Sequence, residues 1–227
     1  MKNKQKYPHN FFEKLAWEKN FYVCGLDEAG RGALAGPVVA AAVILPIKTK
    51  QNFLKDSKIM SKQERDRAYQ WITQHCHYAA AISCYKTIDA INIYQATLQA
   101  MKKAFIHVVA SANLNLQNLQ YVLTNAMPMQ MPSFCRHDHL QLHYFNYGES
   151  VSSSIAAASI VAKVTRDRIM NAMAHAFPAF AFDIHKGYGT QPHTDILAQK
   201  TPSIIHRKTF LIKIHHRHEA KQQLTLF

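Results

Sequence analysis

The stretch Gly25–Val39, with the sequence GLDEAGRGALAGPVV, decides the fold of this chain. It joins two apolar segments, Tyr22–Leu26 and Val38–Leu45, which the pattern predicts to be β-strands. The polar residues between them lie at the end of the first strand, in a glycine-rich turn at the edge of a sheet. Loops held in this way by rigid strands commonly carry functional side chains.

Two adjacent carboxylates, Asp27 and Glu28, open this turn, and Arg31 follows between two glycines. Carboxylates on a rigid backbone can hold a divalent metal ion, and an arginine flanked by glycines can approach a phosphate or a sugar closely. An Asp-Glu pair by itself is also typical of an ordinary polar turn. The residues outside the turn therefore have to distinguish a metal site from a simple turn.

The rest of the sequence alternates between strand-like and helix-like patterns. Helices are predicted at residues 10–18, 61–74, 88–108 and 153–176, and a capping box at Ser61 and Glu64 starts the second of them. Strands are predicted at residues 21–26, 38–45, 77–85, 119–124 and 140–145. This order predicts an α/β fold with a mixed or parallel sheet flanked by helices. We expect an N-terminal extension (1–20), one catalytic domain (21–210) and a basic C-terminal tail (211–227).

The composition favours a polyanionic partner. Lysine and arginine number 27 against 14 acidic residues, which gives a formal net charge of +13. This charge alone does not separate nucleic acid from an anionic membrane surface. Because the apolar run Val38–Ile47 is too short to span a bilayer, and the basic start of the chain leads into no apolar signal core, we expect a cytoplasmic protein with no membrane partner. Nothing in the sequence demands more than a monomer.

Five segments in order resemble the ribonuclease HII (type 2 ribonuclease H) family. They are GLDEAGRGALAGPVV, the loop Asp56–Lys58, the alanine-rich segment Ser154–Asp167, the segment His185–Thr190 and the segment His206–Phe210. The resemblance implies a ribonuclease H-like fold and an endonuclease that cuts RNA embedded in DNA or hybridised to it. It also implies two divalent ions, Mg²⁺ or Mn²⁺, held by four carboxylates.

The catalytic and metal-binding set implied by this resemblance is Asp27, Glu28, Asn125 and Glu149. Asp27 and Glu28 match the family, whereas Asn125 stands where the family has an aspartate, and Glu149 is one methylene longer than the family's acid. An amide oxygen can still ligate a hard cation but brings no charge. We therefore expect weaker metal binding and slower chemistry. Asp138, within His137-Asp138-His139, is a rival ligand, and Asp167 is expected to pair with Lys163 on a helix.

Substrate contacts are likewise implied by the resemblance. Gly30, Arg31 and Gly32 match the turn that contacts the ribose 2′-hydroxyl, the group that distinguishes RNA from DNA. Tyr188 matches the tyrosine that stacks at the RNA-DNA junction. The expected phosphate contacts are Lys58, Lys186, Arg207 and Lys208.

The chain ends in Gln223-Leu224-Thr225-Leu226-Phe227, which resembles the peptide by which bacterial proteins dock on the DNA polymerase sliding clamp. In such a peptide Leu224, Leu226 and Phe227 act as apolar anchors, while Gln223 makes directional hydrogen bonds. The alternative is a terminal turn that folds its leucines back onto the core.

Two functional classes follow. The first is an endoribonuclease that leaves 3′-hydroxyl and 5′-phosphate ends. The second is a catalytically weakened relative that binds RNA-DNA junctions without efficient cleavage. The turn and Tyr188 are expected in both, so only Asn125 and Glu149 bear on the choice.

Overall fold

The computed structural model describes residues 7–112, 115–132 and 139–212. Its centre is a five-stranded sheet in the order β3-β2-β1-β4-β5. The strands are β1 (Tyr22–Ala29), β2 (Val38–Ile44), β3 (His77–Ser83), β4 (Leu119–Asn125) and β5 (Gln141–Phe145). β1 pairs antiparallel with β2 and parallel with β4, and β4 pairs parallel with β5. The predicted mixed α/β sheet is therefore confirmed.

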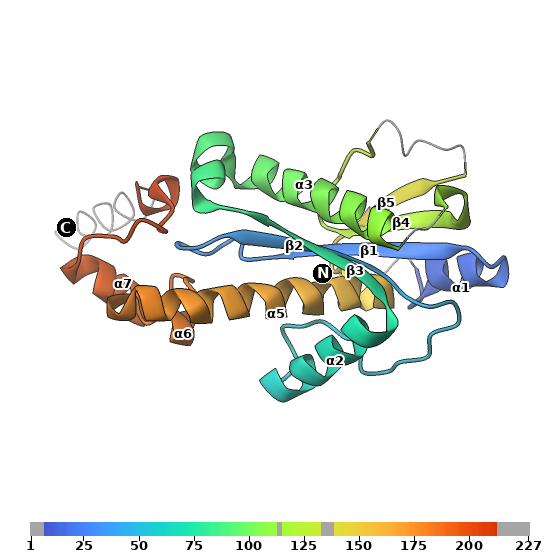
Figure 1. Cartoon of the computed structure of the whole chain (residues 1–227), viewed down its shortest axis with the longest axis horizontal. Helices are drawn as coiled ribbons and strands as arrows, with labels where there is room; N and C mark the ends of the chain where they lie inside the picture. The colour runs from blue at the N-terminus through green and yellow to red at the C-terminus, as the bar shows by residue number, and fades with distance from the viewer. Residues whose placement is uncertain (1–6, 113–114, 133–138, 213–227) are drawn as a thin grey trace, which may run out of the picture.

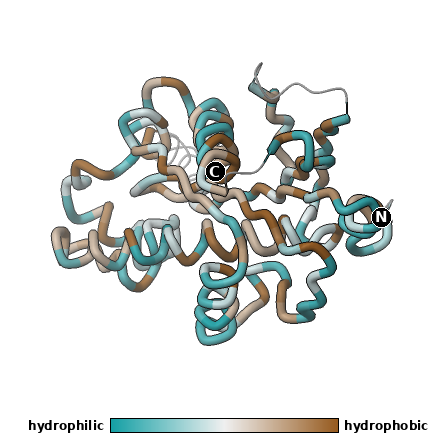
Figure 2. Tube along the Cα trace, turned by 45° about the vertical axis from the view of Figure 1, so that its right-hand side comes forward, coloured by the Kyte–Doolittle hydropathy of each residue, from teal (hydrophilic) through white to brown (hydrophobic). Residues whose placement is uncertain are grey.

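Helices cover both faces of the sheet (Figure 1). α3 (Tyr85–Ser111) lies on one face, while α2 (Lys62–His75) and the long α5 (Ser153–Ala176) lie on the other. Further helices are α1 (Phe11–Glu18), α4 (Gly148–Val151), α6 (Phe182–His185) and α7 (Gln191–Gln199), and residues 208–212 are also helical. Because the sheet is covered twice, every residue of β2 is buried, as its unbroken apolar sequence requires. Figure 2 shows apolar residues along the central layer.

Local sequence explains where several elements begin and bend. The predicted capping box starts α2, since Ser61 accepts from the Glu64 backbone and the Glu64 side chain accepts from the Ser61 backbone. α3 is longer than predicted, and Asn92 interrupts it with a φ of 67°.

None of the helices in the described ranges has both the length and the apolar content that a membrane crossing needs.

Gly25 sets the distance between β1 and α5. A Cβ at this position would lie 2.1 Å from the carbonyl carbon of Ser154, so only glycine allows the helix to lie directly on the strand. The start of α5 is held there by α1, where buried Glu13 accepts hydrogen bonds from the Ser152 hydroxyl and the Ser154 amide. α1 therefore packs onto the same sheet as the rest of the domain and fixes the segment that carries Glu149.

Candidate active site

Asp27, Asn125 and Glu149 meet at one edge of the sheet. Because β1 and β4 are parallel and Leu26 pairs with Thr124, the next residues of the two strands, Asp27 and Asn125, lie side by side. The Asn125 amide donates from Nδ2 to Asp27 Oδ1 at 3.2 Å, and its Oδ1 accepts from the Gly148 backbone at 3.0 Å. Gly148 begins α4, and this link places Glu149 beside the two strand ends.

Two basic side chains form ion pairs with Glu149 and with Glu28, the residue that follows Asp27. Lys58 Nζ lies 3.3 Å from Glu149 Oε1, and Arg31 Nη1 lies 3.2 Å from Glu28 Oε1. Burial lowers the pKa of Lys58, but the carboxylates of Glu149, Asp56 and Asp27 together more than offset this, and the net pKa is raised. The loop residue Lys58, distant in sequence, is therefore part of the carboxylate site.

The carboxylates are electrostatically unfavourable without a further cation. Burial, and then the charges of Glu28 and Glu149, raise the pKa of Asp27 well above its usual value. Burial also raises the pKa of Glu28, although Arg31 acts in the opposite direction, and Glu28 Oε2 is buried with no hydrogen-bond partner. In the described part of the chain no three His, Cys, Asp or Glu side chains are gathered closely enough to enclose a metal ion. The donor set and the unpaired oxygen nevertheless fit a divalent cation chemically.

The predicted substrate turn and Tyr188 also come together. Leu34 N donates to Gly187 O at 2.7 Å, and Ala33 forms a β-bridge with Tyr188. Gly30 has a φ of 94°, a conformation that favours glycine, and the Arg31 side chain is 40% exposed. The turn, the tyrosine and the carboxylates therefore form one continuous region.

One predicted phosphate contact requires correction. Arg207 is fully buried, and its guanidinium donates to the backbone carbonyls of Gly30, Arg31 and Gly36. A side chain used in this way cannot face a phosphate on the surface. Lys208, its neighbour, is exposed, and Lys186 is half-buried with Nζ on the Asp183 carbonyl.

The remaining site predictions have different outcomes. Lys163 and Asp167 form the expected ion pair on α5, with Nζ and Oδ1 2.7 Å apart. Asp138 and the residues Gln223, Leu224, Leu226 and Phe227 lie outside the described ranges.

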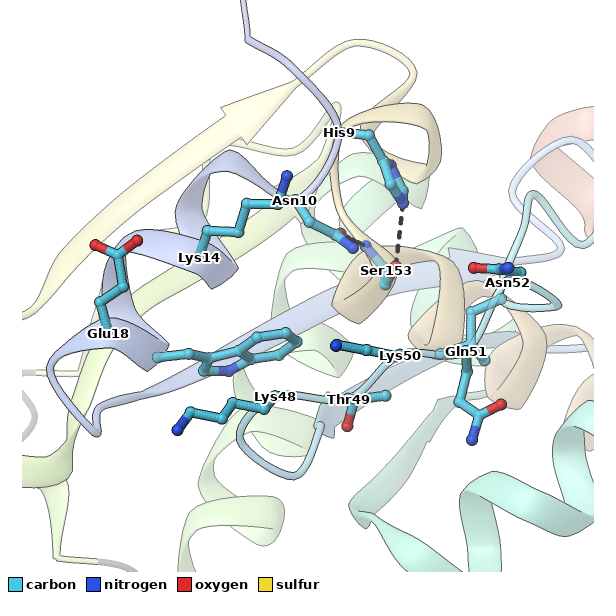
Figure 3. Close-up of a pocket in the computed structure, with 12 residues that line it drawn as sticks. His9, Asn10, Lys14, Glu18, Lys48, Thr49, Lys50, Gln51, Asn52 and Ser153 are labelled. Atoms are coloured by element: carbon cyan, nitrogen blue, oxygen red, sulfur yellow. Dashed lines mark hydrogen bonds between the residues drawn. The ribbon is translucent and has the colours of Figure 1, made fainter.

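A cavity of about 710 Å³ opens beside α1 and is separate from the carboxylates. Figure 3 shows exposed Lys14, Lys48 and Lys50 around it, with Ser153 at the start of α5. None of Asp27, Glu28, Asn125 or Glu149 lines this cavity. It is therefore not the candidate active site.

A cluster of buried histidines supports the segment that carries Tyr188, and sequence reasoning missed it. The His185 and His193 rings stack with centroids 4.1 Å apart, and His193 Nε2 lies 3.0 Å from His206 Nε2. His193 Nδ1 is hydrogen-bonded to the Tyr188 carbonyl at 2.9 Å. The histidines lie in separate segments, so no local spacing in the sequence marked them as neighbours.

This cluster predicts a loss of stability in acid. Burial lowers the pKa of His193 and of His206 from 6.5 to about 4. Between these values the unfolded chain binds protons that the folded chain does not, so the free energy of unfolding falls as the pH drops from about 6.5 towards 4. We expect thermal melting to show a decline of at least about 3 °C between pH 7 and pH 5.

The variant His206→Gln removes one of these titrating groups and should reduce that decline. His107→Gln, at an exposed position of α3, is the matched control and should leave the decline unchanged. Asp27 and Glu28, whose pKa values are raised, act in the opposite direction in all three proteins and cancel in the comparison. Equal pH profiles for the natural chain and His206→Gln would contradict this assignment.

Solved structures of low sequence identity have the same fold. The crystal structure of ribonuclease H2 from Pyrococcus horikoshii OT3 superposes with a TM-score of 0.64 at 21% identity, over 87% of this chain and 98% of that one. The ribonuclease HII of the PCNA complex from Archaeoglobus fulgidus gives 0.61 at 21% identity, over 83% and 95%. These likenesses show that the chain has a ribonuclease H-like fold.

Sequence comparison gives the family. The model of the ribonuclease HII family matches residues 24–218. Ribonuclease HII of Acholeplasma laidlawii is 40% identical over 201 residues, covering 88% of this chain and 92% of the relative, and that of Bacillus subtilis is 41% identical over 202 residues, covering 88% and 73%. The chain belongs to the ribonuclease HII family. It is accordingly a hydrolase of phosphodiester bonds, an endoribonuclease for RNA-DNA hybrids, and the predicted family is confirmed.

Proposed function

We propose that this protein cleaves RNA in RNA-DNA hybrids and single ribonucleotides embedded in duplex DNA, and that it leaves 3′-hydroxyl and 5′-phosphate ends. One observation carries the proposal: Asp27, Asn125 and Glu149 meet at a sheet edge that continues into the Gly30–Gly32 turn and Tyr188. A site that combines carboxylates with a turn suited to a sugar can select a ribose and act on its phosphate.

Mg²⁺ or Mn²⁺ would be held by Asp27, Glu28, Glu149 and the amide oxygen of Asn125. Divalent ions bound there would supply an activated water and stabilise charge on the phosphate and the leaving oxygen. The crystal structure of Bst-RNase HIII in complex with Mn²⁺, at a TM-score of 0.60 and 18% identity, shows that a protein of this fold binds such an ion. Asn125 Oδ1 accepts one hydrogen bond from the Gly148 amide, and its second lone pair would be available to a metal ion.

The protein's own residues bind and orient the substrate. Arg31 and the glycines around it contact the ribose 2′-hydroxyl, while Tyr188 stacks on the adjoining sugar and base. Lys58, Lys186 and Lys208 bind phosphates and determine affinity and its dependence on salt more than selectivity.

The test uses a DNA duplex with one ribonucleotide, incubated with Mg²⁺ or Mn²⁺. We expect one cut, made on the 5′ side of the ribonucleotide so that the product carries a 5′-phosphate. An all-DNA duplex of the same sequence is the control and should stay intact. Failure to cut the ribonucleotide duplex, or a 2′,3′-cyclic phosphate product, would contradict the proposal.

The alternative, a protein that binds junctions without efficient cleavage, is favoured by one observation. The Asn125 side chain turns a donor towards Asp27, where a carboxylate would add ligand charge. Binding of the ribonucleotide duplex with no cleavage in either metal would support this alternative.

We also propose that residues 223–227 dock on a sliding clamp, as their sequence suggests. A protein of this fold has been solved as a complex with PCNA. Deletion of Gln223–Phe227 should weaken binding to a bacterial sliding clamp by at least about ten-fold, because apolar anchors dominate such interfaces. Cleavage of a free duplex should not change. Equal clamp affinity of the full and shortened chains, measured by surface plasmon resonance, would refute this role.

A further inference from the structure

Two arginines, Arg166 and Arg207, are buried without an ion-pair partner in the described part of the chain. Burial of a guanidinium without a carboxylate is costly unless its N–H groups find other acceptors. Burial lowers the pKa of Arg207 to about 9, which leaves the group charged at neutral pH. The hydrogen-bond acceptors of the two guanidinium groups therefore indicate which part of the structure these side chains stabilise.

The five backbone carbonyls that accept from these two guanidinium groups all belong to one short segment, residues 30–37. Arg207 donates to Gly30 O at 2.7 Å, to Arg31 O at 2.9 Å and to Gly36 O at 3.0 Å. Arg166 donates to Pro37 O at 2.9 Å and to Ala35 O at 3.2 Å. The carbonyls of the turn consequently point inward to the arginines.

The turn also packs directly on Arg166. A Cβ at Gly30 would lie 2.0 Å from Arg166 Nε, so the glycine permits contact between the turn backbone and the guanidinium. The same guanidinium lies 5.0 Å from the centre of the Tyr188 ring, within the range of a cation-π contact. Arg166 thus touches both groups to which the proposed function assigns recognition of the ribose.

Backbone hydrogen bonds also join the turn to the segments around Tyr188 and Arg207. Leu34 N donates to Gly187 O at 2.7 Å, Gly36 N to Ile205 O at 2.9 Å, and Arg207 N to Leu34 O at 2.8 Å. Three segments distant in sequence are joined in this way: the turn, the Tyr188 loop and the segment around Arg207.

We propose that Arg166 and Arg207 are positioning residues for ribonucleotide selectivity, which hold the Gly30–Gly32 turn and Tyr188 as one preformed unit around the sugar. This inference rests on the proposed function, because it concerns the same site. Neither arginine contacts the substrate in this proposal. A lysine cannot replace either of them, since its single ammonium cannot reproduce the planar fork that bonds several carbonyls at once.

The test measures selectivity of binding in the cleavage-deficient Asp27→Asn background. Dissociation constants are measured for a duplex with one ribonucleotide and for the same duplex in all-DNA form. Selectivity is the dissociation constant for the all-DNA duplex divided by that for the ribonucleotide duplex. We expect Arg166→Lys and Arg207→Lys to lower this ratio by about ten-fold or more, with affinity for the all-DNA duplex nearly unchanged. Arg168→Lys is the matched control, because Arg168 lies on the same helix and stacks on Tyr69 at 4.4 Å. An unchanged ratio in folded variants overturns the proposal.

Hydrogen exchange of the natural chain provides a measurement that does not depend on folding of the variants. The amides of Leu34, Ala35 and Gly36 should exchange as slowly as those of β1, because the preformed unit opens only with the core. Rapid exchange of these amides overturns the proposal even if both arginine variants unfold. Absence of any preference for the ribonucleotide duplex in the Asp27→Asn parent would instead show that the proposed recognition itself fails.

Discussion

Asp27→Asn is expected to reduce cleavage of the ribonucleotide duplex by about a thousand-fold or more, because it removes a central charge with which the site would hold metal and stabilise the reacting phosphate. Asp27 is only 2% exposed, and repulsion from the Glu28 and Glu149 carboxylates adds to burial in raising its pKa. Substitution by a neutral amide of the same shape removes this repulsion. We therefore also expect the melting temperature in the absence of divalent metal to rise.

The combination of these two results identifies the role of Asp27. A residue that only maintains the fold would lose activity and stability together, whereas a functional carboxylate loses activity and gains stability. Asp167→Asn is the control, since Asp167 lies on α5 in an ion pair with Lys163 and should retain activity within a few-fold. Rapid cleavage by Asp27→Asn, measured in single-turnover reactions, would remove Asp27 from the catalytic set.

The sheet and the main carboxylates could be predicted from the sequence because their signals are local. The sequence of β2 is an uninterrupted apolar run, and the apolar start of β1 leads into Asp27 and Glu28 within the same strand, while Asn125 is the last residue of β4. Once β1 and β4 are parallel neighbours in the register that pairs Leu26 with Thr124, the next residues of the two strands, Asp27 and Asn125, lie side by side. Glu149 was found through its place before the alanine-rich helix.

The support of the site could not be predicted in the same way, because it depends on contacts between distant segments. Arg207 follows a histidine in a basic segment, and a charged residue in such a segment is usually exposed. Its burial results from the path of residues 30–37, which bring three carbonyls to its guanidinium. Glu13 likewise gives no sign in the sequence that it holds the start of α5 from another helix.

Asn125→Asp is expected to increase cleavage at limiting Mg²⁺ by about ten-fold or more, because it restores ligand charge next to Asp27. The same change should make stability depend on metal. At present Asn125 Nδ2 donates to Asp27 Oδ1 at 3.2 Å, and a second carboxylate there would replace this hydrogen bond with repulsion. We therefore expect the variant to melt below the natural chain in chelator and to regain stability when Mg²⁺ or Mn²⁺ is added.

Asn146→Asp is the matched control, because it adds the same charge at an exposed position three residues before Glu149. It should change neither the metal requirement nor the response of the melting temperature to metal. If the natural chain binds the ribonucleotide duplex without cutting it and only Asn125→Asp cuts, the natural protein is the junction-binding form. If both cut and differ mainly in the Mg²⁺ concentration they need, the amide is a working ligand, and Asn125 adjusts the metal dependence of an active enzyme.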